Sequence, residues 1–283
     1  MKFIEQRIDR LQELKQQRPQ YQEVFVFYET LFRFLQGERQ DFLTVAPDQG
    51  NRELRHREGF PLLTGAGILV RKKEAAAFLV RLADVLKEKG LQGQEELARF
   101  QQAIAADTLD LPALFRACLD RNRQILGESA AQAEITPALL EYILDTGLSF
   151  ALQKAREEGL GAQTEGWRQG YCPLCGGFPS MGELTGEEGI RKLHCAACAT
   201  AWTYPRLRCT ACGNTDPDSM EYFTAEGETA HRVDICRKCS SYLKTVDSRQ
   251  AGKDLPMELE DVATLHLDLL AQREGFTRGK RNS

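Results

Sequence analysis

Eight of the nine cysteines in this chain fall between residues 171 and 240, and all eight stand in CxxC pairs. A two-residue spacer lets one tight turn present two sulfurs to a single ion, so each pair supplies half of a tetrahedral site. Four such pairs in a short stretch predict metal ligands rather than disulfides or a redox CxxC. The predicted ligands are Cys172, Cys175, Cys195, Cys198, Cys209, Cys212, Cys236 and Cys239.

The residues that follow the pairs favour two sites built from neighbouring pairs. Gly176 and Gly213 follow the first and third pairs, where a positive φ turns backbone N–H groups toward sulfur, whereas Ala199 and Ser240 follow the other two. Grouping neighbours also closes shorter loops. The first site would then be Cys172, Cys175, Cys195 and Cys198, and the second Cys209, Cys212, Cys236 and Cys239. A cross-braced arrangement, which joins the first pair to the third and the second to the fourth, is the alternative.

Four sulfurs around each ion leave no position for an activated water, so hydrolysis is disfavoured and we expect a structural or docking role and no enzyme. Zinc and iron both accept this ligand set, and iron would add one-electron chemistry. His194 and His231 lie near cysteines, but four thiolates already close each site, so packing or hydrogen bonding is expected of them. Cys118, in an apolar helical run, is expected to be a small buried side chain.

The first 170 residues contain one cysteine and have helical periodicity. Apolar residues recur at spacings of three and four over residues 3–14, 24–35, 75–86, 95–105 and 111–125, with Gly90 as one predicted stop. Thr136 and Pro137 predict the cap and first turn of a helix that reaches residue 157. Residues 38–70 predict a long connection. A helical bundle is the simple way to pack these elements.

The cysteine region has a different pattern, in which short segments such as 201–204 and 221–224 predict small strands between the metal turns. Residues 259–273 predict a final helix packed on one of the domains, and the basic tail of Arg278, Lys280 and Arg281 is expected to be frayed. The predicted fold is therefore mainly α. It has a helical bundle (residues 1–170), two small ribbon modules with four cysteines each (171–205 and 206–248), and a C-terminal helix and tail (249–283).

The composition disfavours several classes of partner. With a formal net charge of −4, the chain gives no support for nucleic acid as an obligatory partner, although Arg191, Lys192, Arg206 and Arg208 form a local basic patch. The aromatic residues of 201–204 and 221–224 are expected in small cores rather than on a base-stacking surface. No apolar run approaches the roughly 18–20 residues that span a bilayer, and the first residues do not form a signal peptide. We therefore expect no membrane insertion and a cytoplasmic location.

Five motifs in the last 110 or so residues resemble a known family, the formate dehydrogenase accessory protein FdhE. They are CPLCG at 172–176, LHCAACAT at 193–200, RCTACG at 208–213, CRKCSSYLK at 236–244 and DVATLHLD at 261–268. The resemblance implies a cytoplasmic factor that is needed to form active formate dehydrogenase, that binds the catalytic subunit, and whose two sites are rubredoxin-like and hold iron, with zinc as the alternative. A rubredoxin-like electron-transfer protein and a nucleic-acid-binding ribbon protein are the competing hypotheses. The sequence does not fix the oligomeric state.

Overall fold

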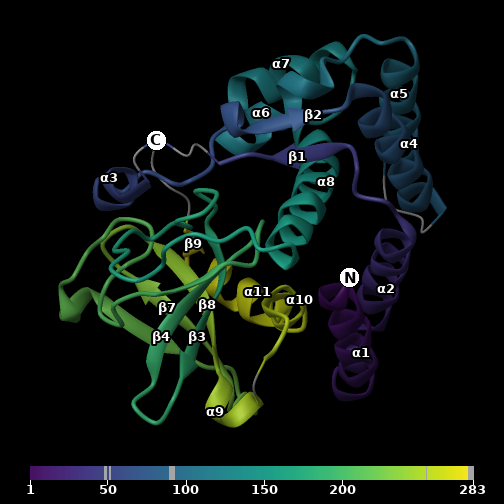
Figure 1. Ribbon diagram of the computed structural model, residues 1–283. Helices are drawn as coiled ribbons and strands as arrows, with labels where there is room; N and C mark the ends of the chain where they lie inside the picture. The colour runs from purple at the N-terminus through teal and green to yellow at the C-terminus, as the bar shows by residue number, and fades with distance from the viewer. Residues whose placement is uncertain (48–49, 51, 89–92, 253, 280–283) are drawn as a thin grey trace. The chain divides into compact units, whose positions relative to one another are not determined.

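The computed structural model describes residues 1–47, 50, 52–88, 93–252 and 254–279 (Figure 1). The chain divides into two compact units. The first comprises Met1–Ile8, Gln22–Gly50 and Leu62–Gly161, and the second Asp9–Tyr21, Asn51–Pro61 and Ala162–Ser283. The first unit is largely helical, and the second holds all eight paired cysteines. The finer domain boundaries inferred from the sequence stay a prediction.

Aromatic side chains fill the core of the first unit. Phe42, directly before β1 (Leu43–Val45), stacks on Phe78 with ring centroids 4.5 Å apart, and Phe78 stacks on Phe150 at 5.9 Å. Gly147 permits this approach, because a Cβ atom there would lie 3.2 Å from the Phe78 ring. Each ring fully removed from water contributes about 1.5–3 kcal/mol. The helices that carry this core are α2 (Gln22–Gly37), α4 (Lys72–Glu88), α5 (Gln94–Ala105), α6 (Leu111–Asp120), α7 (Arg123–Gln132) and α8 (Pro137–Glu157).

Most of the predicted helices in this region are confirmed, including α1 (Lys2–Gln17) and the start of α8 at Pro137. The run 111–125 is not one helix, however. It breaks at Arg121, which takes a φ of 59°, and Asn122 then caps α7 by accepting the N–H of Ile125 at 3.3 Å. The prediction overlooked a gap in the apolar pattern, because residues 120–124 contain no apolar residue and the spacing resumes only at Ile125.

The predicted long connection over 38–70 contains regular structure. Strand β1 pairs antiparallel with β2 (Ile68–Val70), and α3 (Arg52–Arg57) lies between them in the chain. Elements of three to six residues are too short to show a clear period, so the sequence pattern did not reveal them. Gly90, the predicted stop after α4, lies outside the described residues.

One sheet of seven strands organises the second unit. Its order is β5-β4-β3-β8-β7-β6, with β9 paired to β8. Strands β3–β5 and β6–β8 each form an antiparallel set, and a parallel β3–β8 pair joins the sets at Gly182 and Thr245. The strands are β3 (Pro179–Thr185), β4 (Ile190–Cys195), β5 (Ala201–Thr203), β6 (Met220–Phe223), β7 (His231–Cys236), β8 (Ser241–Asp247) and β9 (Thr277–Arg278).

This sheet corrects the expectation of a mainly α fold, because the chain combines a helical unit with a substantial sheet. The joining pair forms between residues about sixty positions apart, and pairing over such a separation leaves no local signal. Gly182 fits the junction because a Cβ atom there would lie 2.5 Å from Thr245 Oγ1. The two cysteine units therefore share one scaffold.

Two helices cover the sheet where the sequence predicted one (Figure 1). The run 259–273 is split at Ala263 and Thr264 into α10 (Met257–Val262) and α11 (Leu265–Arg273). Helix α11 packs on β7 and β8 through a core of Val233, Ile235, Tyr242, Leu267, Ala271 and Phe276. Helix α10 begins with Met257, which packs on β3 and β8 through Met181 and Val246. The prediction that the C-terminal helical segment packs on another part of the protein is thereby confirmed, and that part is the sheet.

A buried lysine fixes the C-terminal segment on the sheet. Lys244 of β8 is fully buried; its Nζ donates to the carbonyl oxygen of Asp261 at 2.6 Å and forms ion pairs with the carboxylates of Asp261 and Asp268. Arg278 pairs with the same two carboxylates from β9. The prediction of a frayed tail is therefore wrong for Arg278, whereas Lys280 and Arg281 lie outside the described residues.

Ion pairs attach residues 9–21 to the same sheet. Glu260 is fully buried and accepts from Arg10 Nε at 2.9 Å, while His231 Nε2 lies 3.0 Å from its other oxygen. Burial acts to raise the pKa of Glu260, but the hydrogen bond with His231 and the charge of Arg10 outweigh it and lower that pKa. Arg18 pairs with Glu228 in the same network.

Crossing a bilayer requires a helix that is both long and apolar. Among the described residues, no single helix meets both requirements. Helices α7 and α8 meet them only when taken together, and they bend by 113° at their junction.

Candidate metal centres

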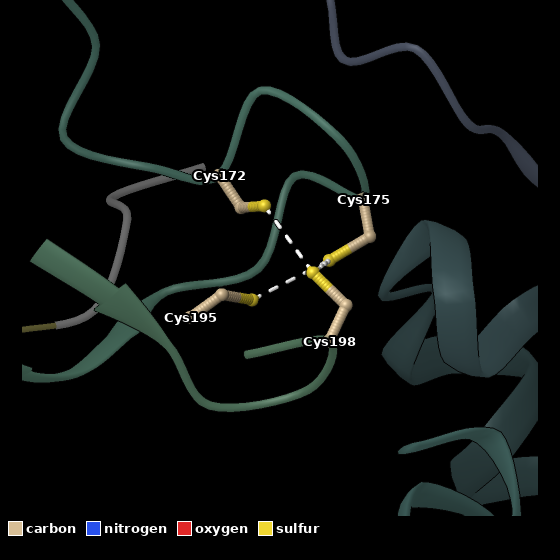
Figure 2. A group of neighbouring side chains, drawn as sticks. All are labelled: Cys172, Cys175, Cys195 and Cys198. Atoms are coloured by element: carbon tan, nitrogen blue, oxygen red, sulfur yellow. Dashed lines mark hydrogen bonds between the residues drawn. The ribbon is translucent and has the colours of Figure 1, made fainter. Parts of the chain in front are cut away.

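The first cage consists of the first two cysteine pairs. Cys172 and Cys175 precede β3, while Cys195 ends β4 and Cys198 lies in the turn before β5. Cys198 Sγ lies 3.5 Å from Cys172 Sγ and 3.5 Å from Cys175 Sγ, and Cys175 Sγ lies 3.5 Å from Cys195 Sγ. Figure 2 shows the four sulfurs turned toward a common centre. All four cysteines are buried, with exposed fractions of 0–3%.

The second cage repeats this plan with the third and fourth pairs. Cys209 and Cys212 precede β6, while Cys236 ends β7 and Cys239 lies in the turn before β8. Cys209 Sγ is 3.6 Å from Cys239 Sγ, and Cys212 Sγ is 3.9 Å from Cys236 Sγ. In each cage the four sulfurs all lie within 4.8 Å of one another. The sequential grouping of the pairs, rather than the cross-braced one, is thus the arrangement in the structure.

The spacing of the sulfurs fits a bound ion. A tetrahedron with metal–sulfur bonds of about 2.3 Å has sulfur–sulfur edges of about 3.8 Å, close to the 3.5–3.9 Å found in the two cages. A disulfide would need about 2.05 Å, and all eight cysteines are free thiols. Each donor set is all sulfur and complete, which suits zinc or iron. The two groups can therefore hold metal ions.

The electrostatics of the first cage also call for a cation. Hydrogen bonding with Cys172 and the other sulfurs, together with burial, raises the pKa of the Cys175 thiol above its ordinary value. Hydrogen bonding with Cys172 and Cys198, together with burial, raises the pKa of Cys195. Burial acts to raise the pKa of Cys198, but hydrogen bonds with the neighbouring thiols and Thr200 outweigh it and lower that pKa. Four adjacent buried thiolates are costly without a positive charge between them, and a divalent ion would remove that cost.

In the second cage Cys209 differs from the other thiols. Burial acts to raise the pKa of Cys209, but hydrogen bonds from Ser241 and from the N–H groups of Cys212 and Ala211 outweigh it and lower that pKa to about 7. Burial is the main cause that raises the pKa of Cys212. One ligand of this cage is therefore poised to ionise near neutral pH.

All four CxxC turns use the same backbone conformation. The residue after each second cysteine has a positive φ of 69° at Gly176, 54° at Ala199, 72° at Gly213 and 52° at Ser240. In the first turn the N–H of Gly176 donates to Cys172 O at 2.9 Å, and the N–H of Gly213 donates to Cys209 O at 3.0 Å in the third. The sequence predicted this conformation at the glycines. Ala199 and Ser240 adopt it although each carries a Cβ atom.

Two hydroxyl groups next to the sulfurs were not predicted. Thr200 Oγ1 lies 3.1 Å from Cys198 Sγ, and Ser241 Oγ lies 3.0 Å from Cys239 Sγ. Each hydroxyl stands two residues after the last cysteine of its cage, which is the sequence signal that could have identified it. Toward a thiolate each would act as a donor and stabilise the charge on sulfur.

The other residues considered from the sequence lie outside the cages. His194 Nε2 is 2.7 Å from Glu183 Oε2, and His231 lies between Glu228 and Glu260. Both histidines therefore make hydrogen bonds rather than approach a metal position. Cys118 is buried in the first unit, where its Sγ lies 3.0 Å from Asp145 Oδ1, and burial raises its pKa.

A close backbone approach connects the entry to the first cage with the second cage. A Cβ atom at Gly170, two residues before Cys172, would lie 2.0 Å from the carbonyl oxygen of Thr210, which follows Cys209. Only glycine fits this position. The entry to the first cage and the first turn of the second are thus packed directly on each other.

Family comparisons converge on this part of the chain. Residues 171–206 match the family model "FdhE, central domain", and residues 207–283 match "FdhE, C-terminal domain". A curated relative, the Protein FdhE homolog of Aquifex aeolicus, is 41% identical over 121 residues, which are 42% of this chain and 42% of that protein. Protein FdhE of Salmonella choleraesuis is 34% identical over 115 residues, or 40% of this chain and 36% of that protein. These alignments span less than half of each relative.

A solved structure extends the similarity to the whole fold. The crystal structure of the FdhE protein from Pseudomonas aeruginosa matches with a TM-score of 0.64 and covers 99% of this chain and 94% of that one. Its sequence identity of 19% shows a shared fold alone. Taken with the two domain matches and the curated relatives, residues 171–283 are similar to the central and C-terminal domains of FdhE, and the chain as a whole shares the fold of an FdhE protein.

Proposed function

We propose that this protein is an accessory factor in the formation of active formate dehydrogenase and that it binds the catalytic subunit of that enzyme. One observation carries the proposal: eight sulfurs converge in two four-sulfur cages within the residues that match the FdhE domains. Complete thiolate sets favour a binding role over catalysis, because neither has an open position for substrate or water.

The metal would hold the docking surface in shape. When ions occupy the cages, the four turns become fixed at the ends of β4 and β7 and at the entries to β3 and β6. Metal binding energy at such sites is also folding energy. The second unit would then present a rigid sheet, with its connecting loops, to the catalytic subunit. We propose iron as the native metal, with zinc as the alternative.

Co-purification of the tagged full-length protein with the catalytic subunit tests this proposal. The Cys172→Ser, Cys175→Ser variant should lose the ion of the first cage and fail to retain the catalytic subunit, whereas Cys118→Ser, outside both cages, should behave as wild type. Because the double variant is also expected to destabilise the unit, wild type should be stripped with a chelator and reloaded. Capture of the catalytic subunit that falls when the metal is stripped and recovers when it is reloaded supports the proposal. Full capture by the metal-free protein contradicts it.

A second candidate is electron transfer at the second cage. Cys212 is exposed and Cys239 is partly exposed, so an ion held there would lie near the surface, where electrons exchange readily. Iron at this site would give a visible absorption band that dithionite bleaches. A colourless protein with two zinc ions after anaerobic purification would eliminate this candidate.

A further inference from the structure

A basic pocket lies in the second unit and takes no part in either cage. Its volume is about 860 Å³. It is lined by residues 164–168, by the start of β4 and by residues 203–206 and 208, which lead from the first cage to Cys209. Its charged lining side chains are Arg168, Arg191, Arg206, Arg208 and Glu165. Four guanidinium groups against one carboxylate make the pocket strongly positive on a chain whose formal net charge is −4.

Arg191 holds this arrangement in place. Its exposed fraction is only 3%, and its Nη1 donates to the carbonyl oxygens of Arg206 at 3.4 Å and Arg208 at 3.2 Å. The carboxylate of Asp234 lies 3.7 Å from Arg191 Nη2. The loop that carries Arg206 and Arg208 is thus fixed by a buried side chain, and the positive groups are preorganised before any ligand arrives.

Two donors in the pocket lining still need an acceptor. Within the described residues, the Nε atoms of Arg191 and Arg208 are buried and have no hydrogen-bond partner. A buried donor without an acceptor is costly, and nearly all such groups in proteins are paired. An oxyanion suits this need because a guanidinium group binds carboxylate or phosphate through two parallel hydrogen bonds.

The pocket also offers apolar surface. The Tyr204 ring lies 6.0 Å from the guanidinium carbons of both Arg191 and Arg208. Trp167 is anchored by its indole N–H, which donates to Tyr171 O at 2.7 Å. Ile190, which lines the pocket, is 46% exposed, and Leu207, between two lining arginines, is 58% exposed. A small inorganic anion would leave these apolar side chains in water.

We propose that this pocket binds an acidic peptide segment of a protein partner, in which carboxylates alternate with apolar side chains. The carboxylates would meet the arginines while the apolar side chains cover Ile190 and Leu207. The negative net charge of the chain favours such a local contact over a long nucleic-acid backbone, which the rest of the protein would repel. The inference rests on the proposed function in one respect: the pocket would supply the chemistry by which the protein recognises its partner, the catalytic subunit.

Fluorescence anisotropy with the full-length, metal-loaded protein tests the inference. The probe is a short labelled peptide in which glutamates alternate with leucines and glycines. Matched probes replace every glutamate by glutamine, or consist of single-stranded RNA, and unlabelled inorganic phosphate serves as a competitor. The test variant is Arg168→Gln with Arg206→Gln, because both side chains are exposed. The control is Arg123→Gln with Arg273→Gln, which removes the same charge at exposed positions elsewhere. Metal content and circular dichroism report whether each variant is folded.

Wild type and the control should bind the glutamate peptide in a salt-sensitive manner, and the test variant should bind at least about tenfold more weakly. Arg168→Gln alone, a single exposed change, should show a smaller loss in the same direction. Equal binding by the test variant, no binding by wild type, or preferential binding of RNA or phosphate through the same arginines would overturn the inference. These outcomes do not depend on formate dehydrogenase, so a failure of catalytic-subunit capture by wild type would contradict the proposed function separately.

Discussion

The two cages share one plan and differ in what covers them. Each has a CxxC turn before the first strand of a three-strand set and a second turn between the last two strands. In the first cage all four cysteines are buried, whereas in the second Cys212 is exposed and Cys239 is partly exposed. Repetition of a local motif therefore fixes the ligands, while the surrounding chain decides how far solvent reaches them.

This difference assigns separate tasks to the two sites. An ion enclosed by buried thiolates exchanges slowly and acts as part of the core. An ion with an exposed ligand is open to chelators, to redox partners and to a docking protein. We therefore expect the first cage to carry more of the folding energy of the second unit and the second cage to be the more reactive.

The largest expected effect comes from breaking the cages one at a time. Apparent binding energies of about 10–16 kcal/mol for structural zinc match or exceed the whole stability of an ordinary domain, about 5–15 kcal/mol. Cys172→Ser with Cys175→Ser should therefore unfold much of the second unit, and Cys209→Ser with Cys212→Ser should cost less. Thermal unfolding by circular dichroism and metal content per chain would measure both. Equal losses of stability in the two double variants would contradict the distinction between the cages. The control variant Cys118→Ser should keep both ions.

The sequence allowed the cages to be predicted because their information is local. Two-residue spacers and the glycines at 176 and 213 specify turns without reference to the rest of the chain. The parallel β3–β8 pairing arises from long-range packing, and so does the difference in burial between Cys175 and Cys212. A short stretch of sequence contains no information about such packing. The break at Thr264 was missed because the apolar spacing continues through it, whereas the break at Arg121 lies in residues 120–124, which contain no apolar residue and were overlooked as a signal. Most of the site, but less of its surroundings, was therefore predictable.

The second prediction concerns the stability that buried ion pairs, rather than the metal ions of the cages, contribute to the second unit. Glu260→Gln removes the buried carboxylate that Arg10 and His231 share and leaves Arg10 only Glu13 and His231 only Glu228 as charged partners, which should cost about 3 kcal/mol at pH 7. Because the pKa of Glu260 is lowered in the folded protein, its contribution is complete above the ordinary value of 4.5 and is lost as the pH falls through the folded value. Urea unfolding of both proteins should show a gap that narrows below about pH 4.5, a value set by that ordinary pKa.

The outcome that would contradict this second prediction is a gap that stays constant or grows as the pH falls. Glu221→Gln is a suitable control, because Glu221 pairs with Arg237 at the surface, where solvent screens the interaction. That change should produce no measurable loss of stability at either pH. Comparing each variant with wild type at the same pH cancels any loss of metal that acid causes.

Gly170→Ala tests the packing between the cages. The new Cβ atom would overlap the carbonyl oxygen of Thr210, so a backbone shift is required and should cost about 1–3 kcal/mol. Since Thr210 lies between two ligands of the second cage, the metal of that cage should also dissociate faster. Gly161→Ala is the control, because nothing lies within 4 Å of the Cβ position there. A free energy of unfolding equal to that of wild type would contradict this prediction, because it would mean that the backbone near Thr210 shifts without measurable cost.

The smallest effect concerns the strained turns. Ala199 and Ser240 have a positive φ, which costs an ordinary residue about 1–2 kcal/mol. Replacement of either residue by glycine removes that strain but adds entropy to the unfolded chain, so a net gain of about 0.5 kcal/mol is expected. The reciprocal change, Gly176→Ala, should destabilise because its Cβ atom would also lie 3.0 Å from Pro61. Chemical denaturation would measure the change in free energy of unfolding for each variant. A loss of stability in the Ala199→Gly variant would contradict the strain argument.

Metal content followed by timed removal tests the central claim most directly. Protein purified without oxygen should contain two ions per chain, and a coloured chelator should extract them in two phases that differ in rate by about tenfold or more. The fast phase should vanish in the Cys209→Ser, Cys212→Ser variant, which assigns it to the more exposed cage. Fewer than two ions, disulfides in place of thiolates, or one extraction phase for both ions would contradict the account.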